Sequence, residues 1–169
     1  MLARVTGGVY LLYFLTAIGG KLLATQGQPR WAGLVNIASI ALYVAVAGLF
    51  YVLFRPVNLG LSLTSLCLGL AGCAVMALKE LRPETRLINS LLFFGLFDVV
   101  IGVLIWKSAF LPPLLGIVMV LAGIGWLVAQ IPSFPAPAAP MVMAFGFVAE
   151  LALMLWLLLR GTALRGHSL

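Results

Sequence analysis

Six apolar stretches, each close to 20 residues long, follow one another through the sequence with short polar or proline-containing breaks between them. An α-helix needs about 20 apolar residues to cross the hydrocarbon core of a bilayer. Only helices and closed barrels satisfy their backbone hydrogen bonds in lipid. The pattern therefore predicts an all-α integral membrane bundle of six transmembrane helices with short loops. They are expected at about residues 5–24, 31–54, 57–78, 87–106, 110–130 and 141–159, in a single transmembrane domain covering 1–169.

The composition supports lipid as the surrounding medium. Hydrophobic residues make up 64% of the chain and charged residues 8%, with a mean hydropathy of +1.21, whereas soluble domains carry about 25% charged residues. The net charge of +6 comes from Lys and Arg residues scattered among the ends of the apolar stretches. A nucleic-acid surface needs a clustered basic patch, so nucleic acid is excluded and membrane lipids are the expected partners.

The distribution of charge gives only a weak indication of which side of the membrane the termini face. With six spans the two termini share one side, and each side carries five basic residues. The positive-inside rule, which counts Lys and Arg, therefore ties. Because Glu80 and Glu84 dilute the positive charge of the other side, we expect cytoplasmic termini in a multi-pass protein of the bacterial inner (cytoplasmic) membrane. Arg55, Lys107 and Arg160 are the expected interfacial anchors.

Two ionisable residues, Asp98 and Glu150, fall deep inside predicted spans. Charged side chains at this depth are costly and are candidates for function by default. One interpretation is a shared intramembrane site for a proton, a cation or a positively charged solute. The other is a structural role, in which each acid is neutral or bonded to a neighbouring polar group. No basic residue is expected deep enough to pair with them, because Lys21 and Lys107 lie near helix ends and can extend to the interface.

Small residues share helix faces with these acids. Gly95 and Gly102 lie at i−3 and i+4 from Asp98, and Gly146 lies at i−4 from Glu150. Glycine lets helix backbones approach closely in lipid, so both acids are expected to face the protein interior. The third span carries a further packing stripe at Ser65, Gly69, Cys73 and Ala77.

The sequence lacks the residues that metal binding, haem binding and nucleophilic catalysis require. The single histidine, His167, lies close to the last residue of the sequence, so haem, zinc and Ser-His-Asp catalysis have no ligand or base inside the bundle. Cys67 and Cys73 are expected on different faces of one helix. We therefore predict no catalytic residues, no metal and no cofactor, and a protein that is not an enzyme.

Aromatic residues near the span ends are typical of an interfacial belt. Alternatively, these aromatic side chains could bind a pigment or the tails of lipids. The residues are Tyr10, Tyr13, Trp31, Tyr51, Trp106 and Trp156.

The chain resembles a family of uncharacterised bacterial membrane proteins, domain of unknown function 4386, over nearly its whole length. The resemblance implies an all-helical membrane protein, marks Glu150 as a position of the family pattern, and implies no reaction. The loops after the first and third helices are shorter than usual. Asp98 stands where the family more often has an apolar residue, beside Phe97 in place of a histidine or tryptophan, which argues against a family-wide acid pair. The matching residues are Arg4, Gly8, Tyr10 and Leu11; Phe54-Arg55-Pro56-Val57-Asn58; Phe93-Phe94-Gly95-Leu96, Gly102, Lys107-Ser108-Ala109-Phe110-Leu111-Pro112, Leu115-Gly116 and Leu121-Ala122-Gly123; and Glu150-Leu151, Trp156-Leu157-Leu158 and Gly161.

Three functions are compatible with these observations. Short loops and abundant small residues favour a non-catalytic accessory or scaffold subunit that packs with other membrane subunits or with copies of itself. The first alternative is a small transporter or channel for protons, cations or a small solute, using Asp98 and Glu150. The second is a protein that contacts lipid or pigment.

Overall fold

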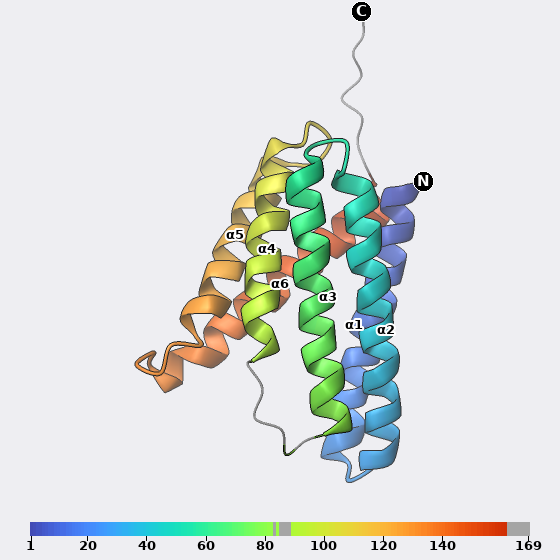
Figure 1. Cartoon of the computed structure of the whole chain (residues 1–169), viewed down its shortest axis with the longest axis vertical. Helices are drawn as coiled ribbons and strands as arrows, with labels where there is room; N and C mark the ends of the chain where they lie inside the picture. The colour runs from blue at the N-terminus through green and yellow to red at the C-terminus, as the bar shows by residue number, and fades with distance from the viewer. Residues whose placement is uncertain (83, 85–88, 162–169) are drawn as a thin grey trace, which may run out of the picture.

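The computed structural model describes residues 1–82, 84 and 89–161, and these form six α-helices and one short 3₁₀ turn (Figure 1). This confirms the predicted all-α fold. Five of the helices are long and apolar enough to cross a membrane. The elements are α1 (Leu2–Thr25), α2 (Pro29–Phe54), α3 (Leu59–Leu81), α4 (Ser90–Lys107), α5 (Pro113–Val128), η1 (Ala136–Ala138) and α6 (Ala139–Leu159).

Proline and asparagine set several of the helix ends. Asn58 caps α3 by accepting a hydrogen bond from the Leu61 amide at 2.8 Å, so this helix begins two residues later than the apolar pattern predicts. The helix predicted at 110–130 is shorter than expected. Residues before a proline disfavour helical backbone, and α5 begins only at Pro113. The predicted start of the fourth helix, near residue 87, lies outside the described residues.

Helix α5 is shorter than the thickness of the hydrocarbon core of a bilayer. Its 16 residues span about 24 Å at 1.5 Å per residue, compared with a hydrocarbon core of about 30 Å. Its neighbour α6 continues from it after a turn that contains η1 and places Pro140 in the first helical turn. In this part of the bundle α5 and α6 diverge from α1, α2 and α3 at the end opposite the N-terminus (Figure 1).

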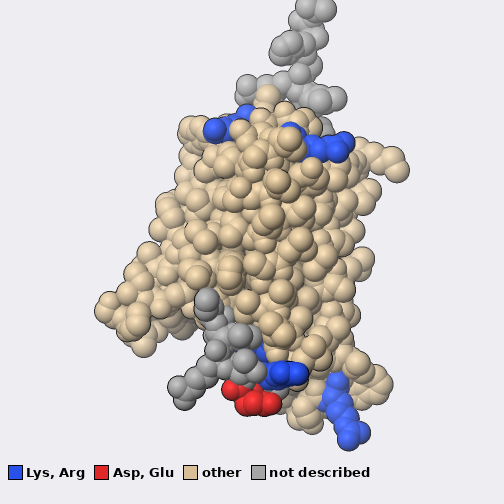
Figure 2. All heavy atoms as spheres, viewed as in Figure 1, with Lys and Arg blue, Asp and Glu red and all other residues tan. Residues whose placement is uncertain are grey.

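The helices form a closed ring. Each packs against its neighbours in sequence, and α6 returns to pack against α1. The N-terminus and the end of α6 lie at the same end of the bundle, which we call the terminus end (Figure 1). Figure 2 shows a continuous band without charge between Lys and Arg residues at the two ends, as expected for a protein surrounded by lipid.

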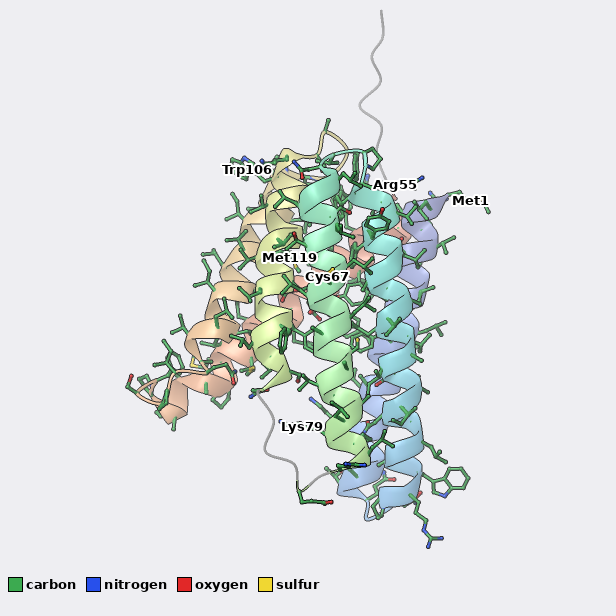
Figure 3. The ribbon with its side chains drawn as sticks, viewed as in Figure 1. Met1, Arg55, Cys67, Lys79, Trp106 and Met119 are labelled. Atoms are coloured by element: carbon green, nitrogen blue, oxygen red, sulfur yellow. The ribbon has the colours of Figure 1, made fainter. Side chains whose placement is uncertain are left out.

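The ends of the bundle carry the interfacial residues. Arg55 and Trp106 lie at the terminus end, and Lys79 lies at the opposite end (Figure 3). Trp106 is 58% exposed and Trp31 is 63% exposed, which agrees with the belt interpretation for these two residues.

Helices α4 and α5 approach each other closely through glycine. A Cβ atom on Gly102 would lie 2.6 Å from the Gly116 carbonyl oxygen, and a Cβ on Gly95 would lie 3.0 Å from the Gly123 carbonyl oxygen. Gly146 of α6 lies against the Trp126 ring. In the third stripe, Ser65, Gly69 and Cys73 are buried. Cys67 is exposed, so the two cysteines face different directions as expected.

One buried hydroxyl joins α3 to α2. Ser62 donates a hydrogen bond to the Tyr51 carbonyl oxygen at 2.9 Å. Interhelical hydrogen bonds of this kind contribute about 0.6 kcal/mol on average in membranes, so Ser62→Ala is expected to lower unfolding stability by about that amount. The matched control is Thr64→Ala, because the exposed Thr64 bonds only to Gly60 within its own helix. Unfolding in mixed micelles measures both, and an equal effect would contradict the bond's role.

Candidate functional site

A cavity of about 560 Å³, here called the chamber, lies inside the helical ring. All six helices contribute to its wall, so it belongs to the bundle as a whole. Its described lining is Tyr13, Phe14, Ala17, Ile18 and Lys21 of α1; Asn36, Ser39, Ile40 and Tyr43 of α2; Met76, Lys79 and Glu80 of α3; Ser90, Leu91 and Phe94 of α4; Trp126 of α5; and Met143, Phe147 and Glu150 of α6.

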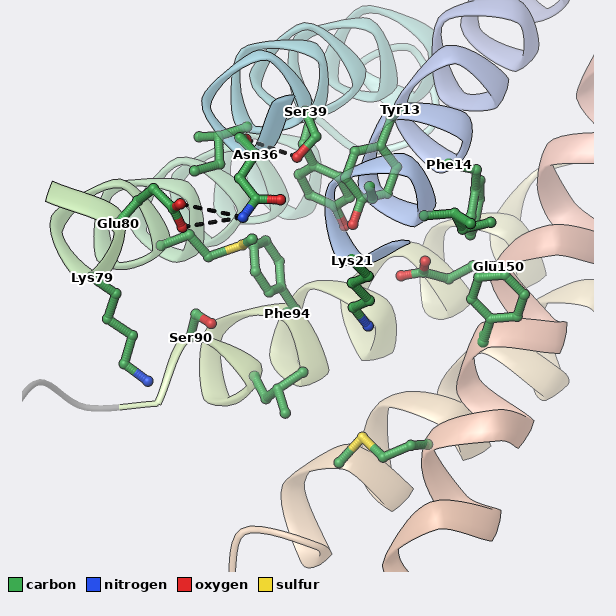
Figure 4. A pocket seen from close by; sticks show the side chains of 18 of the residues that line it. Tyr13, Phe14, Lys21, Asn36, Ser39, Lys79, Glu80, Ser90, Phe94 and Glu150 are labelled. Atoms are coloured by element: carbon green, nitrogen blue, oxygen red, sulfur yellow. Dashed lines mark hydrogen bonds between the residues drawn. The ribbon is translucent and has the colours of Figure 1, made fainter. Parts of the chain in front are cut away.

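The outer part of the chamber lies at the end opposite the termini. Lys21 and Lys79 are exposed and stand near the last residues of α1 and α3. The Asn36 amide donates to the two carboxylate oxygens of Glu80 at 3.3 and 3.4 Å, which ties α2 to α3 at this level (Figure 4). The mouth of the chamber is therefore polar and carries both signs of charge.

The inner end of the chamber is formed by Glu150 and two tyrosines. Glu150 lies near the middle of α6 and is only 4% exposed. Tyr13 and Tyr43 lie near the middle of α1 and α2, with ring centroids 4.7 Å apart. The chamber thus brings a single carboxyl group to mid-depth behind aromatic walls.

Lys21, which was expected to extend to the interface, lines the same chamber as Glu150. Both side chains extend into it (Figure 4). Sharing a cavity is not an ion pair, so the prediction that Glu150 has no basic partner stays a prediction. The long flexible stem of a lysine can equally carry its ammonium group to the interface.

Asp98 lies deeper than the chamber. It is fully buried on α4, and among the described residues neither carboxyl oxygen has a hydrogen-bond partner. The hydroxyls of Tyr10 and Tyr43 are also buried without a partner in the described part of the chain. The Tyr10 and Tyr43 rings pack against each other with their centroids 6.3 Å apart. We call Tyr10, Tyr43, Asp98 and Glu150 the polar cluster.

The polar cluster corrects the prediction made for the tyrosines. Tyr10 was expected in an interfacial belt, but it is fully buried and packs edge-on against Phe50 and Tyr43 at centroid distances of 5.7 and 6.3 Å. Tyr13 is likewise half-buried in the chamber wall. Thr6, Tyr10 and Phe14 recur at a spacing of four residues and lie on the buried side of α1.

Between the polar cluster and the terminus end, the core is packed with apolar side chains. These side chains are nearly inaccessible, so no open path continues from the chamber through this level. They are Phe50, Phe54, Ile101, Leu104, Leu153 and Leu157. The inner end of the chamber is thus formed by Glu150, Tyr13 and Tyr43, and the six apolar side chains beyond the polar cluster are here called the apolar plug.

The fold and the chamber define a multi-pass helical membrane protein, and comparison with known proteins places it in a family. The model of a domain of unknown function, DUF4386, matches residues 74–161, and the chain belongs to this family. It is also similar to an uncharacterised protein of Archaeoglobus fulgidus, with 28% identity over 131 residues that cover 74% of this chain and 80% of the relative. No solved structure matches the chain.

Proposed function

We propose that the protein is a small transporter for a proton or a small positively charged solute, which enters the chamber and is bound at Glu150. The observation that carries this proposal is the position of Glu150 at the inner end of a chamber that all six helices line. A carboxyl group at the middle of a membrane is costly unless it serves a ligand or finds a partner. Polar side chains facing a cavity near mid-depth are typical of transporter binding sites.

A transporter fits the geometry better than an open channel. Lys21, Lys79 and Glu80 line the chamber toward the end opposite the termini, and the apolar plug fills the core toward the terminus end. Movement of a solute to the terminus end requires the helices around the plug to rearrange, which is the alternating access of secondary transporters. The divergence of α5 and α6 from the remaining helices (Figure 1) gives the bundle a division along which this rearrangement can occur.

The aromatic walls support a cationic rather than an anionic solute. Tyr13, Tyr43 and Phe94 line the chamber together with Glu150, and the faces of aromatic rings attract cations. Lys21 and Lys79 lie toward the mouth and are long enough to move away from an entering cation or to exchange with it at Glu150. An accessory subunit and a lipid- or pigment-contacting protein stay predictions, because an apolar outer surface is what lipid alone requires.

For the location, we propose the cytoplasmic membrane with both termini in the cytoplasm. The terminus end carries Arg4, Arg55, Lys107 and Arg160 without any described acidic residue, whereas Glu80 and Glu84 lie at the other end. The chamber would then open to the outside of the cell.

Flux into proteoliposomes tests the proposed function. Purified protein is reconstituted into vesicles under an imposed gradient of protons, sodium, potassium or tetramethylammonium. Proton movement is followed with a pH-sensitive dye inside the vesicles, and uptake of each other cation is measured directly. The expected result is a flux above that of protein-free vesicles for at least one of these cations. Vesicles with protein that match protein-free vesicles for every cation would contradict the proposal.

A further inference from the structure

A second cavity, of about 580 Å³, lies at the terminus end of the bundle and is bordered by Arg4 and Arg160. Arg4 belongs to the first turn of α1, and Arg160 follows the last residue of α6. These are the two helices that close the ring. Met1, Val5 and Gly161 complete the described border, and we call this cavity the arginine pocket.

Local contacts hold each arginine in place. Gly161, directly after Arg160, has a φ of +66°, which is readily adopted only by glycine. A Cβ atom there would lie 3.5 Å from Arg4 Cγ, so the Arg4 stem lies against Gly161. The Arg160 guanidinium lies 5.9 Å from the centroid of the Trp156 ring, a cation–π distance. Two guanidinium groups from different helices are thus directed to one cavity.

No acidic side chain of this protein can neutralise the arginine pocket. The chain contains four Asp and Glu residues in total. Two of these, Asp98 and Glu150, are buried near the middle of their helices, and Glu80 and Glu84 belong to the opposite end. Arg4 and Arg160 are exposed, so their guanidinium groups are free of acidic side-chain partners and accessible to an anion from outside the chain.

We propose that the arginine pocket binds the phosphate of an anionic phospholipid headgroup. Guanidinium groups present a planar set of donors that matches phosphate oxygens. The pocket lies at the ends of α1 and α6, which are both long enough to cross the bilayer, and this is the depth at which lipid phosphates lie. Basic pockets between helix ends are a recurrent form of lipid headgroup recognition. This inference does not depend on the transport function of the chamber.

Native mass spectrometry of the protein released from nanodiscs tests the inference. The nanodiscs contain equal amounts of phosphatidylglycerol and phosphatidylcholine, and the retained lipids are counted for each variant. The wild type is expected to retain phosphatidylglycerol preferentially. A hydrogen bond between charged groups contributes about tenfold to binding, so Arg4→Gln and Arg160→Gln should each lower the preference about tenfold and the double variant further.

The control replaces two exposed arginines at the other end, in the double variant Arg30→Gln/Arg82→Gln. It has the same net charge as the test variant and should keep the wild-type preference. Equal melting temperatures in pure phosphatidylcholine show that the variants are folded. The inference is overturned if Arg4→Gln/Arg160→Gln keeps the wild-type preference, or if the control loses as much. It is also overturned if millimolar inorganic phosphate displaces phosphatidylglycerol, which would identify a site for a free anion.

Discussion

Cation flux in proteoliposomes should fall at least tenfold when Glu150 is replaced by glutamine. Glutamine keeps the size of the side chain and most of its hydrogen bonding, but it can neither carry a negative charge nor release a proton. Glu150 is the acidic residue that lines the inner end of the chamber, and a charge-assisted contact contributes about 1.5–3 kcal/mol. A loss of that size corresponds to a factor of at least ten in binding.

Two controls separate this effect from damage to the fold. Glu80→Gln removes an acid from the chamber mouth, where the Asn36 amide can bond equally well to the glutamine oxygen, and it should lower flux by less than threefold. The Glu150→Gln protein should remain within about 1 kcal/mol of wild-type unfolding stability, because a neutral hydrogen-bonding group replaces the acid. A loss of several kcal/mol would show that an ionised Glu150 is paired structurally. Wild-type flux in Glu150→Gln would remove the binding role.

Asp98→Asn distinguishes the two acids. Asp98 does not line the chamber and is fully buried, so it is not the first group that an entering cation meets. If Asp98 exchanges protons with Glu150 across the polar cluster, Asp98→Asn should keep cation binding and lose proton-driven accumulation. If Asp98 is structural, the variant should lose neither.

Gly102→Ala should destabilise the bundle by about 3 kcal/mol, the largest expected effect on folding. The added Cβ would lie 2.6 Å from the Gly116 carbonyl oxygen and 2.8 Å from the Val120 amide nitrogen. Both are backbone atoms of α5, so the two helices must separate along their whole contact to admit the methyl group. Overpacking of this kind costs about 1–3 kcal/mol, and the value at a backbone contact should be at the upper limit.

The matched control, Gly48→Ala on α2, should change stability in the opposite direction. A Cβ at Gly48 meets nothing within 4 Å, and alanine is favoured over glycine in helices by about 1 kcal/mol. Unfolding in mixed micelles, followed by circular dichroism, measures both variants. If the two changed stability in the same direction, the close approach of α4 and α5 would be contradicted.

Much of the fold could be predicted from the sequence because lipid imposes a simple rule on segment length. The apolar runs and their proline breaks located all six helices, and burial of Asp98 and Glu150 followed from the cost of charge in hydrocarbon. The start of α5 was placed three residues too early, since apolar residues such as Phe110 also occur in the turns between helices.

The chamber could not be predicted because it depends on contacts between helices that are distant in sequence. These helices are apolar on every side, so no hydrophobic face indicates which residues point inward. The contact of α6 with α1 brings Glu150 into one cavity with Tyr13 and Phe14, and nothing in the local sequence of either helix indicates that contact. For the same reason Tyr13 and Lys21 were assigned to an interface and not to the wall of a cavity.

Cysteine accessibility tests the central claim, that a chamber opens away from the termini and extends into the bundle. In a background with Cys67 and Cys73 replaced by alanine, Ala17→Cys introduces a thiol into the chamber wall. Ala45→Cys introduces one on the exposed outer face of α2, where lipid should cover it. The account predicts that a charged, membrane-impermeant thiol reagent labels Ala17→Cys from the side opposite the termini only, and leaves Ala45→Cys unlabelled. Labelling of Ala17→Cys from the terminus side, or from neither side, would contradict the account.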